Sequence, residues 1–313
     1  MTEPTPAPFL EELGERFAEK EVYVTEGTLY VVATPIGRLV DLSFRAVKVL
    51  EGVDLIAAED TRRSYILLNV LGIKKQVISN QKFNEHAKTG YFLDQLRAGK
   101  SIAVISDAGT PCISDPGNEL IRAAAAEGIP VVPVPGACAA VSAVSVSGFD
   151  LTSFLFRGFF PKENTEKREE AKLLKSGVTR TFIYYESPKR IFKTLEFFVS
   201  EALPCRLCLA NDLTKMHERF YRGAPAEVYE ELSANPNAEK GEFTLVVEMD
   251  PAAFVKEAPP QTAESALCDA MIRHSCSAKE AIGILLRQNA PFRKNELKEA
   301  ALKLKNCFGG NET

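Results

Sequence analysis

Three short loops in this sequence combine glycine and proline with hydroxyl or carboxyl side chains, and each follows a run of apolar residues. They are Thr34–Leu39, Ser106–Pro111 and Pro133–Cys138. Glycine and proline let backbone amide and carbonyl groups approach a ligand closely, and Asp107 adds a carboxylate to the second loop. Open α/β sheets bind ligands at the carboxyl ends of their strands. Any one loop is equally well explained as a tight turn, but the three together predict a binding site.

The apolar runs before these loops are predicted to be buried β-strands, because they are short, rich in β-forming residues and end at turn signals. With one further run of the same kind, the predicted strands are Leu29–Ala33, Val53–Ala58, Ser101–Ser106 and Ile129–Val134. Helices are predicted between them. Asp60 is expected to cap one helix, and Asp115 with Pro116 is expected to begin another that ends at Gly128. This alternation predicts an α/β domain with a largely parallel sheet.

That domain is predicted to span residues 28–149, and a second α/β domain is predicted at 150–250. The expected strands of the second domain are Arg180–Tyr185, Arg206–Ala210 and Phe243–Glu248. Ser187 and Pro188 have the residue types of a helix cap and first turn, so a helix is expected to start there.

The remaining segments are a tail, a linker and a helical extension. Residues 1–27 carry seven acidic and two basic residues and are predicted to be a disordered tail. Residues 251–262 contain three prolines and are predicted to be a linker. Residues 263–307 are predicted to be helical, with a capping box from Ser277 to Glu280.

The composition is that of a soluble globular protein, with 45% hydrophobic and 26% charged residues. No apolar run is long enough to span a membrane and no export signal is recognised, so the cytoplasm is the expected location. The net charge of −4 argues against a generally basic nucleic-acid binder. Because the acidic tail accounts for that charge, the body is near neutral, and any RNA contact is expected from local basic patches.

The cysteines and glycines exclude several kinds of site. The chain has 7 cysteines, an odd number that suits reduced thiols. Cys205 and Cys208 have the spacing of half a zinc site, but a strand would place them on opposite faces, so no metal is predicted. No two glycines have the Gly-x-Gly spacing of the dinucleotide fingerprint.

The order of the motifs resembles the tetrapyrrole methylase superfamily and, within it, the branch that methylates RNA of the small ribosomal subunit. The motifs that carry the resemblance are Thr34–Gly37, Glu59–Arg62, Ser106–Pro111, Ser114–Gly117, Pro135–Gly136, Gly158–Pro161, Tyr185–Pro188 and Leu213–Lys215. They cover about residues 28–249. The chain departs from the usual pattern at Arg38, at Cys138 and at Asn211–Asp212, where the superfamily branch has Asn, Ser and Arg-Glu.

The resemblance implies a fold, a cofactor, a substrate and an assembly. The fold would be two α/β domains of tetrapyrrole-methylase type with the cofactor cleft between them, followed by the helical extension. S-adenosyl-L-methionine would donate a methyl group to the ribose 2′-hydroxyl of a decoding-centre cytidine in 16S ribosomal RNA. The substrate would lie within the 30S subunit, and the enzyme would be a homodimer.

The superfamily pattern also implies residue roles. The residues expected to bind the cofactor are Pro35, Ile36, Gly37, Asp107, Gly109, Thr110, Cys138, Ala139, Tyr185, Leu213 and Phe243. Because a ribose hydroxyl is a weak nucleophile, a carboxylate base is expected near it, and Glu59, Asp60 and Glu186 are the candidates. Asp60 as a helix cap and Glu186 in an ion pair with Lys189 or Arg190 are equally open interpretations.

Two adjacent pairs of basic residues, Arg62–Arg63 and Lys189–Arg190, lie beside motif loops and are expected to contact RNA phosphates. The alternative is that each is a surface residue exposed to solvent, with no role in RNA binding. Two other functions remain open: a small-molecule methylase that acts on a tetrapyrrole, and a non-catalytic RNA-binding assembly protein with the same fold.

Overall fold

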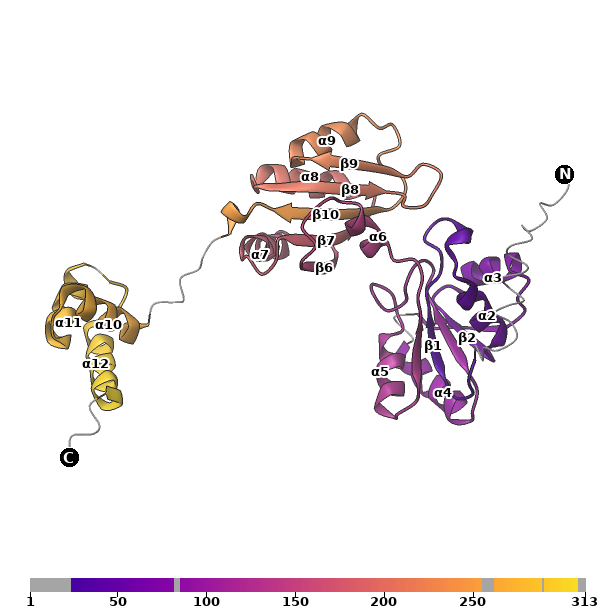
Figure 1. Ribbon diagram of the computed structural model, residues 1–313, viewed down its shortest axis with the longest axis horizontal. Coiled ribbons are helices and arrows are strands. Elements are labelled where there is room, and N and C mark those ends of the chain that lie inside the picture. Colours follow the sequence, from indigo (N-terminus) through magenta and orange to yellow (C-terminus); the bar gives the residue numbers. More distant parts are fainter. Residues whose placement is uncertain (1–23, 82–84, 255–261, 289, 309–313) are drawn as a thin grey trace. The chain divides into compact units, whose positions relative to one another are not determined.

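The structure, a computed structural model, describes residues 24–81, 85–254, 262–288 and 290–308 (Figure 1). The chain divides into two compact units, Met1–Phe254 and Val255–Thr313. Most of the predicted acidic tail and most of the predicted linker lie outside the described residues. The structure differs from the expected tail at its end, where Val24 packs against the core that contains Val49 and Leu50.

The first unit begins with a parallel five-stranded sheet in the order β3-β2-β4-β1-β5. Its strands are β1 (Leu29–Val32), β2 (Leu55–Ala58), β3 (Gln76–Ser79), β4 (Ile102–Ile105) and β5 (Val131–Val134). The four predicted strands are confirmed. β3 was not predicted, because this edge strand is only partly buried and lacks a continuous apolar run.

Helices cover both faces of this sheet. They are α2 (Phe44–Gly52), α3 (Thr61–Val70), α4 (Glu85–Arg97) and α5 (Asn118–Ala126), with a short 3-10 helix η1 (Leu39–Asp41) before α2. Side chains of alternate strand residues point to opposite faces. Tyr30 and Val32 therefore pack toward α2 and α3, whereas Leu29 packs with α4 and α5. Four-residue strands buried on both faces explain the continuous apolar runs in the sequence.

Asp60 caps α3 as predicted, and its carboxylate accepts a hydrogen bond of 2.9 Å from the Arg62 amide. The predicted start of α5 is wrong. The helix begins at Asn118 with Gly117 as its N-cap, and Gly117 has φ +123°. A Cβ there would lie 2.7 Å from Cys112 Sγ, so a tight turn packed on the sheet delays the helix and leaves Asp115 in a loop.

The second sheet has five strands in the order β6-β7-β10-β8-β9 and is antiparallel except for the β6–β7 pair. The strands are β6 (Phe154–Phe159), β7 (Thr181–Glu186), β8 (Cys205–Asn211), β9 (Arg219–Gly223) and β10 (Phe243–Met249). The helices of this part are α6 (Ala139–Ser145), α7 (Asn164–Lys175), α8 (Ile191–Ser200) and α9 (Pro225–Ser233). Helices α7, α8 and α9 pack on one face, and α6 packs on the other.

Helix α8 begins later than predicted. Ser187 is not its cap, because residues 188–190 form a turn and Arg190 is the N-cap. The Ser187 amide donates to the Glu186 carboxylate at 2.7 Å, which fixes this turn before the helix.

Cys205 and Cys208 lie on opposite faces of β8, as predicted. Cys205 contacts the core that includes Leu207, and Cys208 lies in the core that includes Ala210. Burial raises the pKa of the Cys205 thiol to about 12 and also raises that of Cys208. Among the described residues, no group of three or more acidic, histidine or cysteine side chains is placed to hold a metal ion.

The described residues of the second unit form three helices, α10 (Ala263–His274), α11 (Ala278–Arg287) and α12 (Lys294–Phe308). They share a core of their own that includes Leu267, Leu285 and Leu297. The predicted capping box is present, since Ser277 and Glu280 exchange hydrogen bonds at the start of α11. The described helices of the first unit do not include one long and apolar enough to span a membrane, and neither do these three.

Candidate functional site

A cavity of about 310 Å³ lies where all three loops of the first sheet meet one end of the second sheet. The loops follow β1, β4 and β5, which are neighbours in the sheet, so their carboxyl ends meet at one edge. The lining residues are Ile36, Ala108, Gly109, Thr110, Ile113, Ser114, Asp115, Cys138, Ala139, Phe159, Tyr185, Glu186, Ser187, Pro188, Glu242, Phe243 and Thr244. The walls therefore combine apolar side chains with exposed backbone and a few polar groups, which is typical of a small-molecule site.

Hydrogen bonds between the loops fix the first wall. Thr34 and Gly109 exchange backbone hydrogen bonds of 2.9 and 3.0 Å, and the Thr110 hydroxyl donates to the Ala137 carbonyl at 3.0 Å. Gly109 has φ +83°, and a Cβ there would lie 3.3 Å from Ile36 Cγ2. The second loop therefore needs glycine at this position, because a side chain would strain the backbone and push against the first loop.

Residues of β7 form the opposite wall. The Tyr185 hydroxyl accepts a hydrogen bond of 3.3 Å from the Ala140 amide at the start of α6. Its ring packs edge-on against Phe156 and Phe159, with centroids 4.9 and 5.9 Å away. Burial raises the pKa of Tyr185, so the phenol is neutral and available only as a hydrogen-bonding group.

The first loop also contacts the segment after β8. The Arg38 amide donates to the Thr214 hydroxyl at 3.1 Å, and Arg38 Nε donates to the Thr214 carbonyl at 2.7 Å. A Cβ on Gly37 would lie 2.6 Å from Thr214 Oγ1 and 2.7 Å from Lys215 Cγ. Gly37 is thus needed for close approach of the two segments.

The predicted cofactor residues divide into two groups. Those that line the cavity are Ile36, Gly109, Thr110, Cys138, Ala139, Tyr185 and Phe243. Pro35, Gly37, Asp107 and Leu213 adjoin these residues but do not line it. Asp107 instead accepts a hydrogen bond of 3.1 Å from the Asp60 amide and lies 3.3 Å from Arg63 Nη1.

The three candidate bases differ in environment. Hydrogen bonds from Arg62 lower the pKa of Asp60 to about 2. The same carboxylate is the N-cap of α3, so it is already engaged within its own helix. The Glu186 side chain is fully buried, and it accepts hydrogen bonds from the Ser187 amide, Arg190 Nε and the Thr194 hydroxyl.

Glu59 differs from both, because burial and the neighbouring Asp115 and Asp107 carboxylates raise its pKa. Asp115 itself lines the cavity, and burial raises its pKa as well. The sequence predicted Asp115 as a helix cap, and its place in the site was missed. The signal for that place was its position in Ser114–Gly117, a motif after the second loop.

The four predicted RNA-binding residues also differ in their exposure and in their hydrogen-bond partners. Arg62 is paired with Asp60 at 2.8 Å although its side chain is 89% exposed, and Arg63 is 66% exposed beside Asp107. Lys189 is exposed. Arg190 is held by Glu186 and by the Phe160 carbonyl at 2.8 Å, although its Nη1 is buried with no hydrogen-bond partner in the described part of the chain.

Comparison with known proteins identifies the family. Residues 28–229 match the model of the Tetrapyrrole (Corrin/Porphyrin) Methylases. The chain is 39% identical over 279 residues to ribosomal RNA small subunit methyltransferase I of Pasteurella multocida, which covers 88% of this chain and 97% of that protein. It is 40% identical over 221 residues to the protein of the same name from Thermotoga maritima, which covers 71% of this chain and 98% of that one.

A solved structure shares the fold at lower identity. The cobalamin biosynthetic enzyme cobalt precorrin-4 methyltransferase is 19% identical, with a TM-score of 0.51, over 70% of this chain and 94% of that chain. The chain belongs to the tetrapyrrole (corrin/porphyrin) methylase family and, within it, to the family of the relatives named ribosomal RNA small subunit methyltransferase I.

Proposed function

We propose that this chain transfers a methyl group from S-adenosyl-L-methionine to the ribose 2′-hydroxyl of a decoding-centre cytidine in 16S ribosomal RNA. The observation that carries the proposal is the cavity at the joined carboxyl ends of β1, β4 and β5, closed by the ends of β7 and β10. The names of relatives about 40% identical over most of their length support RNA of the small subunit as the substrate.

The residues of the cavity fit S-adenosylmethionine. Gly109 leaves its backbone open where a Cβ would meet Ile36, so the loops can contact a ligand through main-chain groups. Ile36 and Phe243 offer apolar contacts, and the Asp115 carboxylate and the hydroxyl of Ser114 offer polar ones. When bound, the cofactor supplies an electrophilic methyl group on a sulfonium.

The chain's part in the reaction is to position the acceptor and to receive its proton. Positioning accounts for much of the catalysis of a displacement of this kind. Asp115 is the best-placed carboxylate to accept the proton of the hydroxyl, because it lines the cavity and its pKa is raised by burial. Glu59 lies in the same carboxylate cluster and is the second candidate for that role.

Assembly and location belong to the same proposal. Lys189 is exposed, and Arg62 and Arg63 are largely exposed beside Asp60 and Asp107, so all three can reach the phosphates of a 30S subunit in the cytoplasm. A homodimer is supported by Ile66 and Val70, which lie four residues apart on α3 and are 66% and 64% exposed. Replacing both by Glu is expected to yield a monomer in light scattering, and an unchanged mass would place the interface elsewhere.

A tetrapyrrole methylase is the second candidate, and the family description of the matched model favours it. A methyl-labelled cofactor distinguishes the two. The proposal predicts label in the RNA of 30S subunits and none in a porphyrinogen, whereas the opposite distribution overturns it. A non-catalytic assembly protein would bind 30S subunits without transferring label to either.

A further inference from the structure

A second concave region lies at the same end of the second sheet as the cofactor cavity. Two adjoining cavities, of about 430 and 290 Å³, share Arg219 and Asn235. We call them together the polar trough. Its residues are Asn211, Asp212, His217, Arg219, Phe220, Tyr221, Glu231, Ala234, Asn235, Asn237 and Lys240.

Strand register places the trough beside the cofactor cavity. Phe243 of β10 pairs with Asn211 of β8, and Asn211 pairs with Arg219 of β9. Adjacent strands lie about 4.8 Å apart, so the backbone of Arg219 is about 10 Å from the backbone of Phe243. Phe243 lines the cofactor cavity. A short stretch of one nucleic-acid strand can reach both.

Ion-paired side chains lie between the polar trough and the cofactor cavity. Asp212 lines the trough and Glu242 lines the cofactor cavity. Lys215 Nζ lies 2.9 Å from Asp212 Oδ1 and 3.2 Å from Glu242 Oε2, and it bridges the two carboxylates. Lys215 therefore offsets part of the negative charge that Asp212 brings to the trough.

Three basic side chains of the trough are available to a ligand. His217, Arg219 and Lys240 are exposed. Within the residues that the structure describes, no hydrogen bond or ion pair engages the side chain of His217 or Arg219. The Lys240 ammonium donates to the Asn237 side-chain oxygen at 3.2 Å and forms no ion pair with any described residue.

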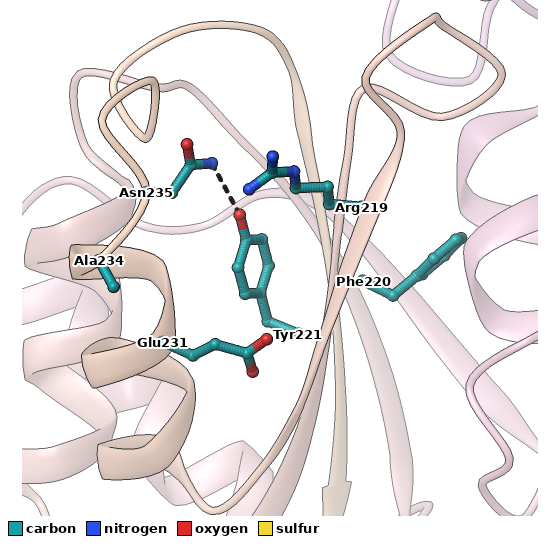
Figure 2. Close-up of a pocket in the computed structure, with 6 residues that line it drawn as sticks. All are labelled: Arg219, Phe220, Tyr221, Glu231, Ala234 and Asn235. Atoms are coloured by element: carbon teal, nitrogen blue, oxygen red, sulfur yellow. Dashed lines mark hydrogen bonds between the residues drawn. The ribbon is translucent and has the colours of Figure 1, made fainter.

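The guanidinium of Arg219 points toward polar groups of the smaller cavity. Figure 2 shows its guanidinium near the Tyr221 hydroxyl and the Asn235 amide, which are joined by a hydrogen bond of 2.8 Å. The Glu231 carboxylate lies near the opposite end of the Tyr221 ring, and no ion pair joins it to Arg219. Among the described residues, Arg219 thus lines this polar cavity without forming an ion pair.

We propose that the polar trough binds a backbone phosphate of the substrate RNA, next to the nucleotide that receives the methyl group, through His217, Arg219 and Lys240. This inference rests on the proposed function. Arginine and lysine near one phosphate position a strand without reading its sequence. The trough is then the part of the substrate site that holds the strand while the cofactor cavity holds the reacting ribose.

The test uses the full chain with Arg219→Gln and Lys240→Gln combined. Both replaced residues are exposed, so the double variant is expected to fold. KM for 30S subunits is expected to rise by about tenfold, because the variant cannot form charged hydrogen bonds to the phosphate. The slope of log affinity against log salt is expected to fall by about 0.7 for each phosphate of a single strand that the variant no longer neutralises. Affinity for S-adenosylmethionine is expected to stay at the wild-type value.

Arg168→Gln combined with Lys193→Gln is the matched control, since replacing these exposed residues on α7 and α8 removes the same charge outside the trough. Arg219→Lys is expected to restore part of the affinity. A trough variant with wild-type KM and salt slope, in an enzyme that does methylate 30S subunits, overturns the inference and leaves the proposed function intact. A wild-type chain that neither binds nor methylates 30S subunits overturns both.

Discussion

The side-chain hydroxyl of Thr110 donates a hydrogen bond of 3.0 Å to the carbonyl oxygen of Ala137. This bond joins the loop after β4 to the loop after β5, and both line the cavity that we propose binds the cofactor. Thr110→Val keeps the shape of the side chain and leaves the carbonyl unpaired, at a cost of about 1 kcal/mol or more. We expect the dissociation constant for S-adenosylmethionine, measured by calorimetry, to rise about five- to tenfold.

Thr110→Ser is the control for that change, because it keeps the donor. Its affinity for the cofactor is expected to remain within about twofold of wild type, since the hydrogen bond persists. Equal affinities for the Ser and Val variants would show that the bond does not position the loops for binding.

Gly109→Val is expected to weaken cofactor binding more strongly while the protein stays folded. The substitution places a β-branched side chain at φ +83°, against Ile36 and the Ala137 carbonyl. The left-handed conformation alone costs about 1–2 kcal/mol. Gly128→Val is a matched control, because Gly128 has φ +71° with nothing within 4 Å of its Cβ position. Both variants should lose thermal stability, but only Gly109→Val should lose affinity for S-adenosylmethionine, and equal affinities would contradict the site.

Asp115→Asn is expected to lower the methylation rate about a hundredfold or more, the usual loss when a general base is removed. Burial raises the pKa of Asp115, and the carboxylate form is the base, so the wild-type rate should rise as the pH passes upward through that raised pKa. The variant should lose this part of the pH profile. Asp60→Asn should keep both rate and profile, because its carboxylate is held in a helix cap.

The raised pKa of Asp115 also predicts that the stability of the fold falls as the pH rises, whereas the methylation rate increases. A carboxyl group whose pKa is higher in the folded than in the unfolded chain stabilises the fold below that pKa, and this stability is lost as the pH rises. Asp115→Asn should therefore gain stability relative to wild type between acidic and neutral pH in urea unfolding. If Asp115→Asn retains the wild-type methylation rate and pH profile, Asp115 is not the base, and Glu59 becomes the candidate.

Truncation after Gln261 is expected to preserve cofactor binding and weaken binding to 30S subunits. The helices of the second unit have their own core, and 221 residues of this chain match 98% of the Thermotoga maritima relative. Arg287, Arg293 and Lys294 are exposed where α11 ends and α12 begins. Replacing these three by Gln should lower the salt slope of 30S binding, and slopes and affinities equal to wild type would leave this unit a structural role only.

The loops of the first sheet were predictable because each follows a buried strand and contains glycine and proline, which are local signals. Asp115 was not, because its place depends on the close contact of Gly117 with Cys112, which delays α5. The polar trough was also not predicted. Arg219 lies beside Asn211 only through the pairing of β8 with β9, and no local pattern reports that pairing.

The most direct measurement of the central claim is mass spectrometry of 16S ribosomal RNA from cells with and without this gene. The proposed function predicts one ribose-methylated cytidine in the decoding centre that is absent when the gene is deleted and returns with the wild-type gene but not with Asp115→Asn. An unchanged set of modified nucleotides after deletion would contradict it, and so would a missing methyl group on a base rather than a ribose.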